Sequence, residues 1–558
     1  MSNTNKSYLD TLPTEILYRI CDGLDSETIL FSFRRVCKRF HTISKIYDRY
    51  RLDLCYFSMS DLRRMEYLID PKNVTSLTLA NEDKSSGLME YFLDHFSLRT
   101  FSRLDSMTFA LHHKIDFDRF AKFIEQSSLT TLSIWLCNYS LTSFQNLIEA
   151  LKSCRLKNLI ILDRVDWTSL MFIVNTLTDL QKLVLKSFHK QPYDNLAESQ
   201  VNSEEVSKLT SLSLNMKAEV EIQYIESILM RCPHLQCFQL DSSGNKADKS
   251  LFDGHKWENL IETRLLLLKQ FEFHFSYHPP RFGNIFDVDA SFESFQTPFW
   301  RDRKQWFVRC DYVASEDKKW YDVYTVPMNI REEFDLSCHR MTILDSMLPT
   351  MDESKANVVH VHRLTLNLNQ LMIENTQTRT NLLAKYQFRN VKELVLIIDQ
   401  EWSNDAIECL STMIVLSNLE KIHLKIEDKC KFVRDLYTKL KGLLKQAWDL
   451  RSLKITSTNP RTRKQIIRDK IALKLSRYTD ELDIEVQDLD DAKAILQNEK
   501  YLSHLTFRPI LNDNVNLVHE IEDWLPHTKR HYTVESAVNW LCDGGCCTSS
   551  KGVYIWLD

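Results

Sequence analysis

One apolar spacing recurs along most of the chain and constrains its fold more than any other feature. The template is an apolar residue, two residues of any type, a second apolar residue, one further residue and a third apolar residue, as in Leu129, Leu132 and Ile134. The copies follow one another about every 24 to 30 residues, a period typical of repeat proteins. The second residues of the N-terminal copies are Leu77, Met107, Leu132, Leu159, Leu183, Leu212 and Phe238.

The last two template positions predict a short strand in every copy. Residues i and i+2 of a strand point to the same side of the sheet, and one strand cannot bury that side alone. The strands are therefore expected to stack and share a continuous core, with helical stretches at 120–124 and 144–151 on the convex side. The template returns about every 23 to 31 residues in the C-terminal part. The second residues there are Leu364, Leu394, Ile422 and Leu453, with weaker copies at Leu482 and Leu505.

The copies resemble leucine-rich repeats, which implies an α/β solenoid shaped like a horseshoe. That family usually carries Asn or Cys three residues after the last template position. Cys137 and Asn369 fit this slot, but Phe188, Lys217 and Thr458 occupy it elsewhere, so the repeat is divergent. An ordinary parallel α/β sheet remains an alternative. One long horseshoe with an irregular middle and two shorter arcs both fit the spacing.

The middle of the chain interrupts the repeat. Residues 241–256 are polar and predict a loop, followed by a helix over 257–268 and an alternating strand over 271–275. The stretch 279–339 lacks the template, and we expect its aromatic side chains in a core, because an exposed patch this apolar would be a liability. These residues are Phe292, Phe295, Phe299, Trp300, Trp306, Phe307 and Tyr312. Residues 540–558 are expected to cap the open end.

The stretch 12–40 near the N-terminus differs from everything that follows it. Pro13 suits the first helical position, and Gly23 is a plausible end for that helix. Asp25 and Ser26 offer N-caps for a second helix, and a third helical run follows. Three short helices in about 45 residues bury little apolar surface, so this unit should lean on the rest of the chain or on a partner.

This stretch resembles the F-box, the module that docks substrate receptors onto a Skp-type adaptor and a cullin ubiquitin ligase. The likeness rests on the Leu12-Pro13-x-Glu15-Ile16-Leu17 opening and the Val36-Cys37-Lys38-Arg39-Phe40 close. The family often has Trp where this chain has Phe40. The alternative is a helical cap that shields the first strand of the following domain. The resemblance implies these adaptor-docking residues: Leu12, Pro13, Ile16, Leu17, Val36, Cys37 and Phe40.

The predicted organisation is α/β, with a three-helix F-box before a leucine-rich-repeat-like solenoid. We place the F-box at 5–52, a first repeat arc at 53–240, an irregular aromatic-rich middle block at 241–355 and a second arc with a C-terminal cap at 356–558. A chain of 558 residues is too long for one compact core.

Composition argues against several kinds of partner. The net charge of −5 predicts neither nucleic acid nor a membrane as a partner. No apolar run approaches the length of a membrane span. Fourteen cysteines without a framework, and no signal peptide at the start, predict free thiols in the cytoplasm or nucleus.

No motif in the sequence predicts an enzyme. Phosphate-binding loops and nucleophile elbows are absent. Cys542-x-x-x-Cys546-Cys547 lacks the paired C-x-x-C spacing of a zinc site. His360 and His362 lack a further ligand at metal spacing, and Asp399 and Glu401 fit a polar turn after a strand. We therefore expect no catalytic residue, metal or cofactor.

The strand residues beside the inward pair predict a target-binding surface on the concave side. Neighbouring strands lie about 4.8 Å apart, so Lys421, Lys425 and Lys454 are expected to form one basic patch. An acidic or phosphorylated segment of a target protein would fit it; solvated strand faces are the alternative. The candidates are Arg363, Lys421, His423, Lys425, Lys454 and Trp135. The sequence thus predicts a substrate-recognition adaptor of a cullin-type ligase, or a non-ligase interaction scaffold.

Overall fold

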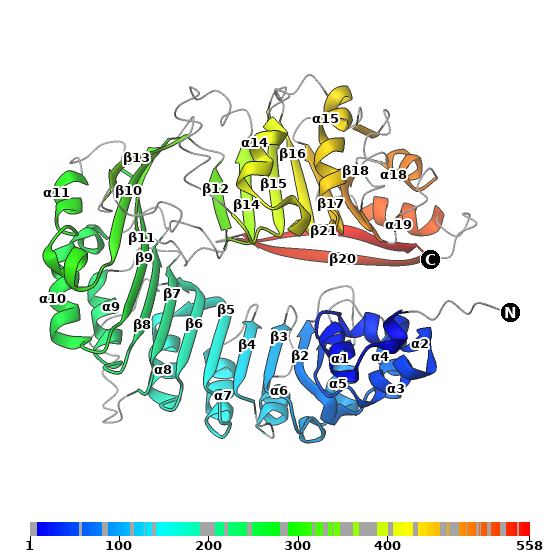
Figure 1. The fold of residues 1–558 in the computed structure, drawn as a ribbon, viewed down its shortest axis with the longest axis horizontal. Coiled ribbons are helices and arrows are strands. Elements are labelled where there is room, and N and C mark those ends of the chain that lie inside the picture. Colours follow the sequence, from blue (N-terminus) through cyan, green and yellow to red (C-terminus); the bar gives the residue numbers. More distant parts are fainter. Residues whose placement is uncertain are drawn as a thin grey trace. The chain divides into compact units, whose positions relative to one another are not determined.

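The computed structural model of the chain contains two compact units (Figure 1). The first unit comprises residues 1–216, 222–238 and 262–268, and the second comprises residues 217–221, 239–261 and 269–558. The structure describes residues 8–54, 59–80, 88–111, 117–125, 127, 129–136, 141–189, 207–216, 221–242, 248–279, 288–314, 319–326, 333–336, 339–345, 361–367, 388–399, 406–427, 433–457, 462, 466–467, 479–486, 488–497, 502, 504–509, 515–524, 532–543 and 546–557.

The first unit begins with the predicted helical segment. Its elements are η1 (Tyr8–Thr11), α1 (Thr14–Asp22), η2 (Thr28–Phe33), which continues directly into α2 (Arg34–Val36), and α3 (Lys38–Ile46). The three predicted helical runs are confirmed. Pro13 is the N-cap residue of α1 instead of its first helical residue, so that prediction was wrong by one position.

Parallel strands follow in chain order in the first unit. They are β1 (Tyr50–Asp53), β2 (Val74–Ala80), β3 (Ser106–Leu111), β4 (Thr131–Leu136), β5 (Asn158–Asp166), β6 (Lys182–His189) and β7 (Ser211–Met216). Each pairs in parallel with the next. The second template residues stand opposite one another across the sheet, from Leu77 opposite Met107 to Leu183 opposite Leu212. The predicted strand positions are therefore confirmed.

Helices between these strands cover one side of the sheet (Figure 1). They are α4 (Met59–Glu66), α5 (Leu88–His95), α6 (Phe117–Ile124), α7 (Leu141–Lys152), α8 (Trp167–Thr176) and α9 (Ile222–Leu229), with short turns η3 (Pro71–Asn73) and η5 (Leu98–Thr100). Helix α7 buries Phe144, Leu147, Ile148 and Leu151, which share one helical face. The apolar strand positions, such as Leu132 and Ile134, are fully buried.

The middle block supplies antiparallel strands to the second unit. β9 (Gln270–Tyr277) pairs with β11 (Lys319–Val326), which pairs with β10 (Phe307–Ala314), and β10 pairs with β13 (His339–Asp345). Short helices accompany them: η6 (Lys249–Phe252), α10 (Gly254–Arg264), α11 (Val288–Glu293) and η7 (Phe299–Arg303). The expected aromatic core is confirmed for four residues that are buried, while Trp306, Phe307 and Tyr312 are partly exposed. The buried four are Phe292, Phe295, Phe299 and Trp300.

The predicted loop at 241–256 was wrong at both ends. Asp241 belongs to β8 (Cys237–Ser242), and η6 and α10 occupy the C-terminal half of the segment. Asp241 is buried beside His274 of β9, so a polar residue continues the strand where a loop was expected.

The second unit also contains a parallel sheet in chain order. Its strands are β12 (Glu333–Leu336), β14 (Arg363–Asn367), β15 (Glu393–Ile398), β16 (Lys421–Ile426), β17 (Ser452–Ser457), β18 (Glu481–Val486) and β19 (His504–Pro509). Each pairs in parallel with the next. Template residues again stand opposite one another, from Leu364 opposite Leu394 to Leu482 opposite Leu505.

Helices on one side of this sheet complete a single core (Figure 1). They are α14 (Ala406–Met413), α15 (Val433–Gln446), α18 (Leu489–Leu496) and α19 (Val515–Trp524), with the turn η9 (Leu416–Asn418). Leu410 and Leu443 from these helices join Leu424 and Leu453 from the strands in that core.

A long antiparallel hairpin ends the second unit. It consists of β20 (Tyr532–Asp543) and β21 (Cys546–Leu557), and β21 pairs with β19. This pairing covers the β19 edge of the parallel sheet with another strand. The role of residues 540–558 as a C-terminal cap stays a prediction.

The structure therefore shows a mixed α/β fold with an N-terminal helical domain and large parallel sheets. The leucine-rich-repeat class and the horseshoe stay predictions. Cys137 and Asn369, the two residues that fit the family's polar slot, lie outside the described residues.

Candidate docking surfaces

Helix α1 presents one apolar face inward and a smaller one outward. Leu17 and Cys21 are buried one turn apart, while Ile16 keeps 39% of its surface exposed. Glu15 lies in the first turn, where its charge favours the helix dipole. Gly23 caps the C-terminus of the helix as predicted.

The turn between α2 and α3 displays Val36. Cys37 adopts an extended backbone and its Sγ accepts a hydrogen bond from the backbone N–H of Phe40 at 3.5 Å, so it caps α3. Phe40 stacks on Phe33 with ring centroids 4.4 Å apart and is buried beneath the turn. Val36 is left with 68% of its surface exposed.

A hydrogen bond joins the two ends of the predicted docking motif. The Arg39 guanidinium donates to the backbone carbonyl of Leu12, although these residues are 27 positions apart in sequence. Leu12 is half-buried and Pro13 is exposed. The opening of the motif therefore lies beside the α2–α3 turn that carries Val36.

The structure divides the seven predicted docking residues into two groups. Pro13, Ile16 and Val36 are exposed, and Leu12 and Cys37 are half-buried. Leu17 and Phe40 are fully enclosed by their own domain, so a protein on its surface would not touch them. Their part in the motif is to support the exposed residues from within.

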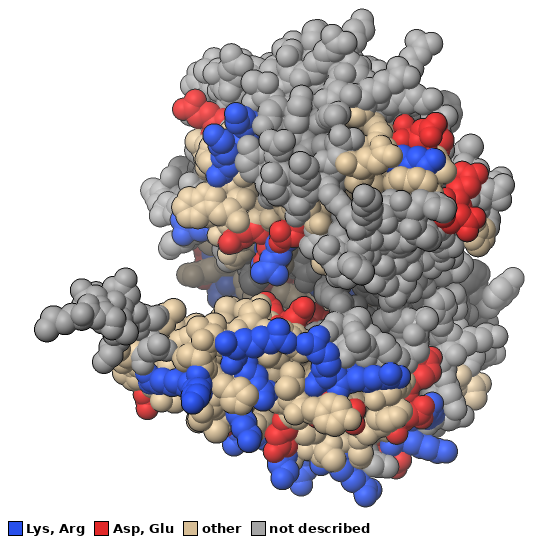
Figure 2. All heavy atoms as spheres, turned by 90° about the vertical axis from the view of Figure 1, so that its right-hand side faces the viewer, with Lys and Arg blue, Asp and Glu red and all other residues tan. Residues whose placement is uncertain are grey.

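A hollow with basic walls lies beside the α2–α3 turn. We call it the basic hollow; its described lining includes Leu30, Arg34, Arg35, Cys37, Lys38, His41, Thr42, Arg64, Tyr67 and Leu68. None of these ten residues is Asp or Glu. Lys and Arg side chains gather on the face of the molecule that carries the N-terminal helices (Figure 2).

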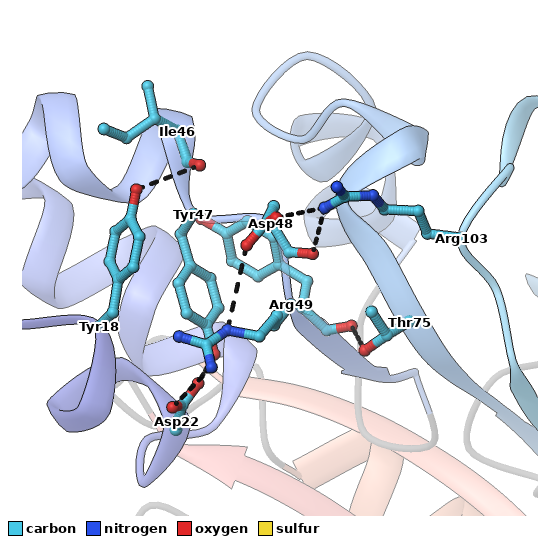
Figure 3. A network of polar contacts seen from close by, with 9 residues as sticks. Tyr18, Asp22, Ile46, Tyr47, Asp48, Arg49, Thr75 and Arg103 are labelled. Carbon is cyan, nitrogen blue, oxygen red and sulfur yellow. Dashed lines mark hydrogen bonds and ion pairs between the residues drawn. The ribbon is translucent and has the colours of Figure 1, made fainter. Parts of the chain in front are cut away.

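A polar network fastens the N-terminal helices to the sheet of the first unit (Figure 3). Asp22 of α1 accepts a hydrogen bond from the Tyr47 hydroxyl at 2.8 Å and an ion pair from Arg49 at 3.3 Å. Arg103, just before β3, forms an ion pair with Asp48. The hydrogen bond from Arg103 lowers the pKa of Asp48. Burial, together with the hydrogen bond that the Tyr47 hydroxyl donates to Asp22, raises the pKa of Tyr47.

Two further hydrogen bonds extend this network along the chain (Figure 3). The Thr75 hydroxyl of β2 donates to the Tyr50 carbonyl at 3.3 Å, and the Tyr18 hydroxyl donates to the Ile46 carbonyl at 3.5 Å. These two bonds join α1 to the end of α3 and β2 to β1.

The six predicted target-binding residues lie in different surroundings. Lys421 and Lys425 are exposed, and Trp135, Arg363 and Lys454 are partly buried, but His423 keeps only 8% of its surface. Trp135 belongs to the first unit and the other five belong to the second.

The face around His423 is more mixed in charge than the expected basic patch. His423 stands opposite Lys454 in the β16–β17 register, and Lys454 lies 3.9 Å from Asp483. Arg508 forms hydrogen bonds to both oxygens of the same Asp483, at 2.7 and 2.9 Å. Arg363 pairs with Glu333 and Glu393. Lys454 and Arg363 are thus partly neutralised.

The field at the centre of this face is nevertheless positive. Burial lowers the pKa of His423 to about 3, and the cations Lys454, Lys425, Arg363 and Arg508 act in the same direction. The His423 Nε2 lies 2.9 Å from the Thr456 hydroxyl, which satisfies the neutral imidazole.

Sequence reasoning missed a buried polar cluster in the second unit. His274 of β9 is fully buried, with its Nδ1 3.0 Å from Asp241 and its Nε2 3.6 Å from Asp322. Asp322 accepts a hydrogen bond from the Ser276 hydroxyl at 2.5 Å. The strand pattern placed His274 on the polar side of β9, but no sequence signal indicated that this side is buried.

The remaining His, Cys, Asp and Glu residues that the sequence analysis considered do not form a catalytic or metal site within the described residues. His362 precedes β14 and contacts the Asn390 carbonyl at 3.1 Å, and Asp399 accepts a hydrogen bond from Asn367 at 2.8 Å. Their sequence companions His360 and Glu401 lie outside the described residues. Cys542 and Cys547 are paired in the register of the terminal hairpin. Within the described residues, no group of three or more His, Cys, Asp or Glu side chains is arranged to hold a metal ion.

Comparison with known families identifies the N-terminal domain. Residues 9–52 match the family model of the F-box domain. This supports an F-box protein, a class typical of adaptors in cullin ubiquitin ligases. No curated protein matches the chain. Among the helices in the described part of the chain, none has the length and apolar character needed to cross a membrane.

Proposed function

We propose that this chain is the substrate-recognition adaptor of a cullin-type E3 ubiquitin ligase. The F-box match supports docking to a Skp-type adaptor. The observation that carries the proposal is the arrangement of Pro13, Ile16 and Val36, which stay exposed above a core that Leu17 and Phe40 complete without them. Exposed apolar side chains held by a rigid domain are a common basis of protein interfaces.

The proposed task is positional and non-enzymatic. The F-box domain would hold the ligase, and the strand faces of the following units would hold a target protein. Target lysines then gain a high effective concentration of activated ubiquitin. Such a ligase adaptor would work in the cytoplasm or nucleus, and no residue of this chain need form a covalent bond.

The proposed target surface in the second unit centres on Lys421 and Lys425. Both ammonium groups are exposed on the same face of β16, and the positive field at His423 lies between them. An acidic or phosphorylated segment of a target fits this charge. Arg363, Lys454 and, in the first unit, Trp135 are further candidates. We also propose that the parallel strands in chain order form divergent leucine-rich repeats.

The decisive experiment measures binding of the full chain to the purified Skp-type adaptor. Val36→Glu should lower the affinity at least about tenfold, or about 1.4 kcal/mol, because it places a charge in an apolar interface. Met230→Glu is the matched control, since Met230 is also exposed and lies in the first unit. Leu12→Ala with Pro13→Ala should weaken binding as well.

The alternative function is a non-ligase scaffold whose N-terminal helices only cap the sheet. The network around Asp22 and Asp48 favours the scaffold, because it fastens those helices to β1 and β2. Absence of adaptor binding by the wild-type chain, or equal binding by wild type and Val36→Glu, would establish the scaffold instead.

A further inference from the structure

The basic hollow concentrates positive charge between the F-box domain and the segment that contains α4. Arg34, Arg35, Lys38 and Arg64 supply four cations, and His41 adds an imidazole. None of the ten described lining residues is acidic, so the described lining of the hollow carries only positive charge. Leu30 is buried and Cys37 is half-buried in the same lining, so part of the hollow is apolar.

Two of these cations are held in place before any partner binds. The Arg34 Nε donates to Nδ1 of His41 at 3.2 Å, and its Nη1 donates to the Leu68 carbonyl at 3.2 Å. The Arg64 guanidinium lies 5.1 Å from the centroid of the Phe31 ring. Ordering these side chains in advance reduces the entropy lost when an anion binds.

The other two cations project from the helices without such anchors. Arg35 and Lys38 are exposed, and neither side chain has a hydrogen bond or an ion pair with a described residue. Exposed cations of this kind attract carboxylates over several ångströms and are screened by salt. A hollow that combines anchored cations with exposed ones therefore suits an extended acidic chain better than a single small anion.

The position of the hollow indicates which protein supplies that chain. Cys37 lines the hollow, and the preceding residue, Val36, belongs to the proposed docking surface and keeps 68% of its surface exposed. A protein that covers Val36 must therefore reach the rim of the hollow. We propose that the basic hollow binds an Asp- and Glu-rich segment of the same Skp-type adaptor, an inference that rests on the proposed function.

With this contact, adaptor docking would combine apolar contacts with charge contacts, and the two would affect different rates. Apolar contacts at Val36 and Ile16 resist dissociation once they form. Charge contacts at the edge of an interface mainly raise the association rate and make it depend on salt. Carboxylates pair with guanidinium groups through two parallel hydrogen bonds, which also fixes the orientation of the segment.

The test compares two double charge reversals in the full chain. Arg35→Glu with Lys38→Glu alters the basic hollow, and Lys72→Glu with Arg99→Glu makes the same change in net charge at exposed positions of the same unit outside it. Association and dissociation rates with the purified adaptor are measured at low and high salt. The hollow variant should lose at least tenfold in affinity at low salt, mainly through slower association, and should show a weaker salt dependence. The control should stay within twofold of wild type.

A competitor distinguishes the hollow from general charge effects. A synthetic peptide of ten glutamates should slow adaptor association with the wild type and the control, but not with the hollow variant. If hollow variant and control bind the adaptor equally, the inference is wrong. Loss of binding to phosphatidylserine vesicles in the hollow variant, with adaptor affinity unchanged, would assign the hollow to a membrane and also overturn it.

Failure of this inference differs from failure of the proposed function. If Val36→Glu abolishes adaptor binding while the hollow variant matches the control, docking stands and the acidic contact does not. If the wild-type chain does not bind the adaptor, both the proposed function and this inference are wrong.

Discussion

Single side chains of the F-box motif have two separate tasks in this domain. Val36 and Ile16 point to the surface, whereas Leu17 and Phe40 complete the core. The apolar spacing predicted helices, but it did not separate these tasks, because both kinds of residue are apolar and occupy adjacent positions in the motif. The distinction depends on how the helices pack, which requires the structure.

A substitution at Phe40 should therefore lower the folding stability much more than a substitution at Val36. Phe40→Ala removes a buried ring that stacks on Phe33 and should cost about 3–5 kcal/mol of folding stability. Val36→Ala removes exposed atoms and should change stability by no more than about 0.5 kcal/mol. Urea unfolding followed by circular dichroism measures both. A similar loss in the two variants would mean that Val36 belongs to the core.

His423 should make the stability of the second unit depend on pH. Burial and the surrounding cations lower its pKa to about 3 from 6.5. The unfolded chain therefore binds a proton below pH 6.5 that the folded chain does not accept. Stability should fall by about 1.4 kcal/mol per pH unit from this source as the pH drops below that value.

The variant His423→Gln should lose this contribution. Urea midpoints measured between pH 7 and pH 5 should decline less steeply in His423→Gln than in the wild type. His362→Gln, which removes an exposed imidazole from the same unit, is the control. Parallel pH curves for the wild type and His423→Gln would contradict a neutral, buried His423.

Strands and helices were predictable wherever one face is apolar and the other is solvated. The template residues recur at one spacing, and the strands from β2 to β7 and from β14 to β19 form at those positions. Where both faces of a strand are buried, the sequence pattern predicted less. In β9 nearly every side chain is buried, including Glu272, His274 and Ser276, so alternation revealed the strand but not its second buried face.

The middle block shows a related limit at the level of elements. Its aromatic residues predicted a core, and Phe295 and Trp300 confirm it. The antiparallel order of β9, β11, β10 and β13 was not predicted, because this pairing depends on contacts between distant segments rather than on local spacing. The candidate site was likewise predicted only in part. The sequence motif located the F-box segment, but it did not predict the basic hollow.

Two helical glycines provide a matched test of packing between elements. A Cβ on Gly254, the first residue of α10, would lie 2.5 Å from the backbone oxygen of Ser294, whereas a Cβ on Gly442 in α15 meets nothing within 4 Å. Gly254→Ala should therefore lower stability by about 1–3 kcal/mol. Gly442→Ala should raise it by up to about 1 kcal/mol through helix propensity. Stabilisation in both variants would show that Ser294 moves away at little cost.

The whole molecule places the two proposed binding functions on residues that share no element. The docking residues belong to the N-terminal helices, and Lys421 and Lys425 belong to β16 in the second unit. Val36 in the first set and Lys421 and Lys425 in the second set are exposed, so the cores of the two units do not depend on these three side chains. Each function can therefore be removed by substitution without unfolding the unit that carries it.

Separate removal of the two functions should give different patterns of bound and modified proteins in cells. Val36→Glu should retain targets but lose the adaptor and the ubiquitin conjugates. Lys421→Glu with Lys425→Glu should retain the adaptor and lose those targets that carry acidic or phosphorylated segments, because like charges repel.

The control for net charge is Lys441→Glu with Lys445→Glu, which changes two exposed cations on α15. Affinity purification with quantitative mass spectrometry, combined with proximity labelling of trapped ubiquitin conjugates, measures both patterns. If the β16 variant and the α15 control recover the same targets, the target surface lies elsewhere on the chain. That result would leave the adaptor proposal unchanged, because Val36→Glu tests it separately.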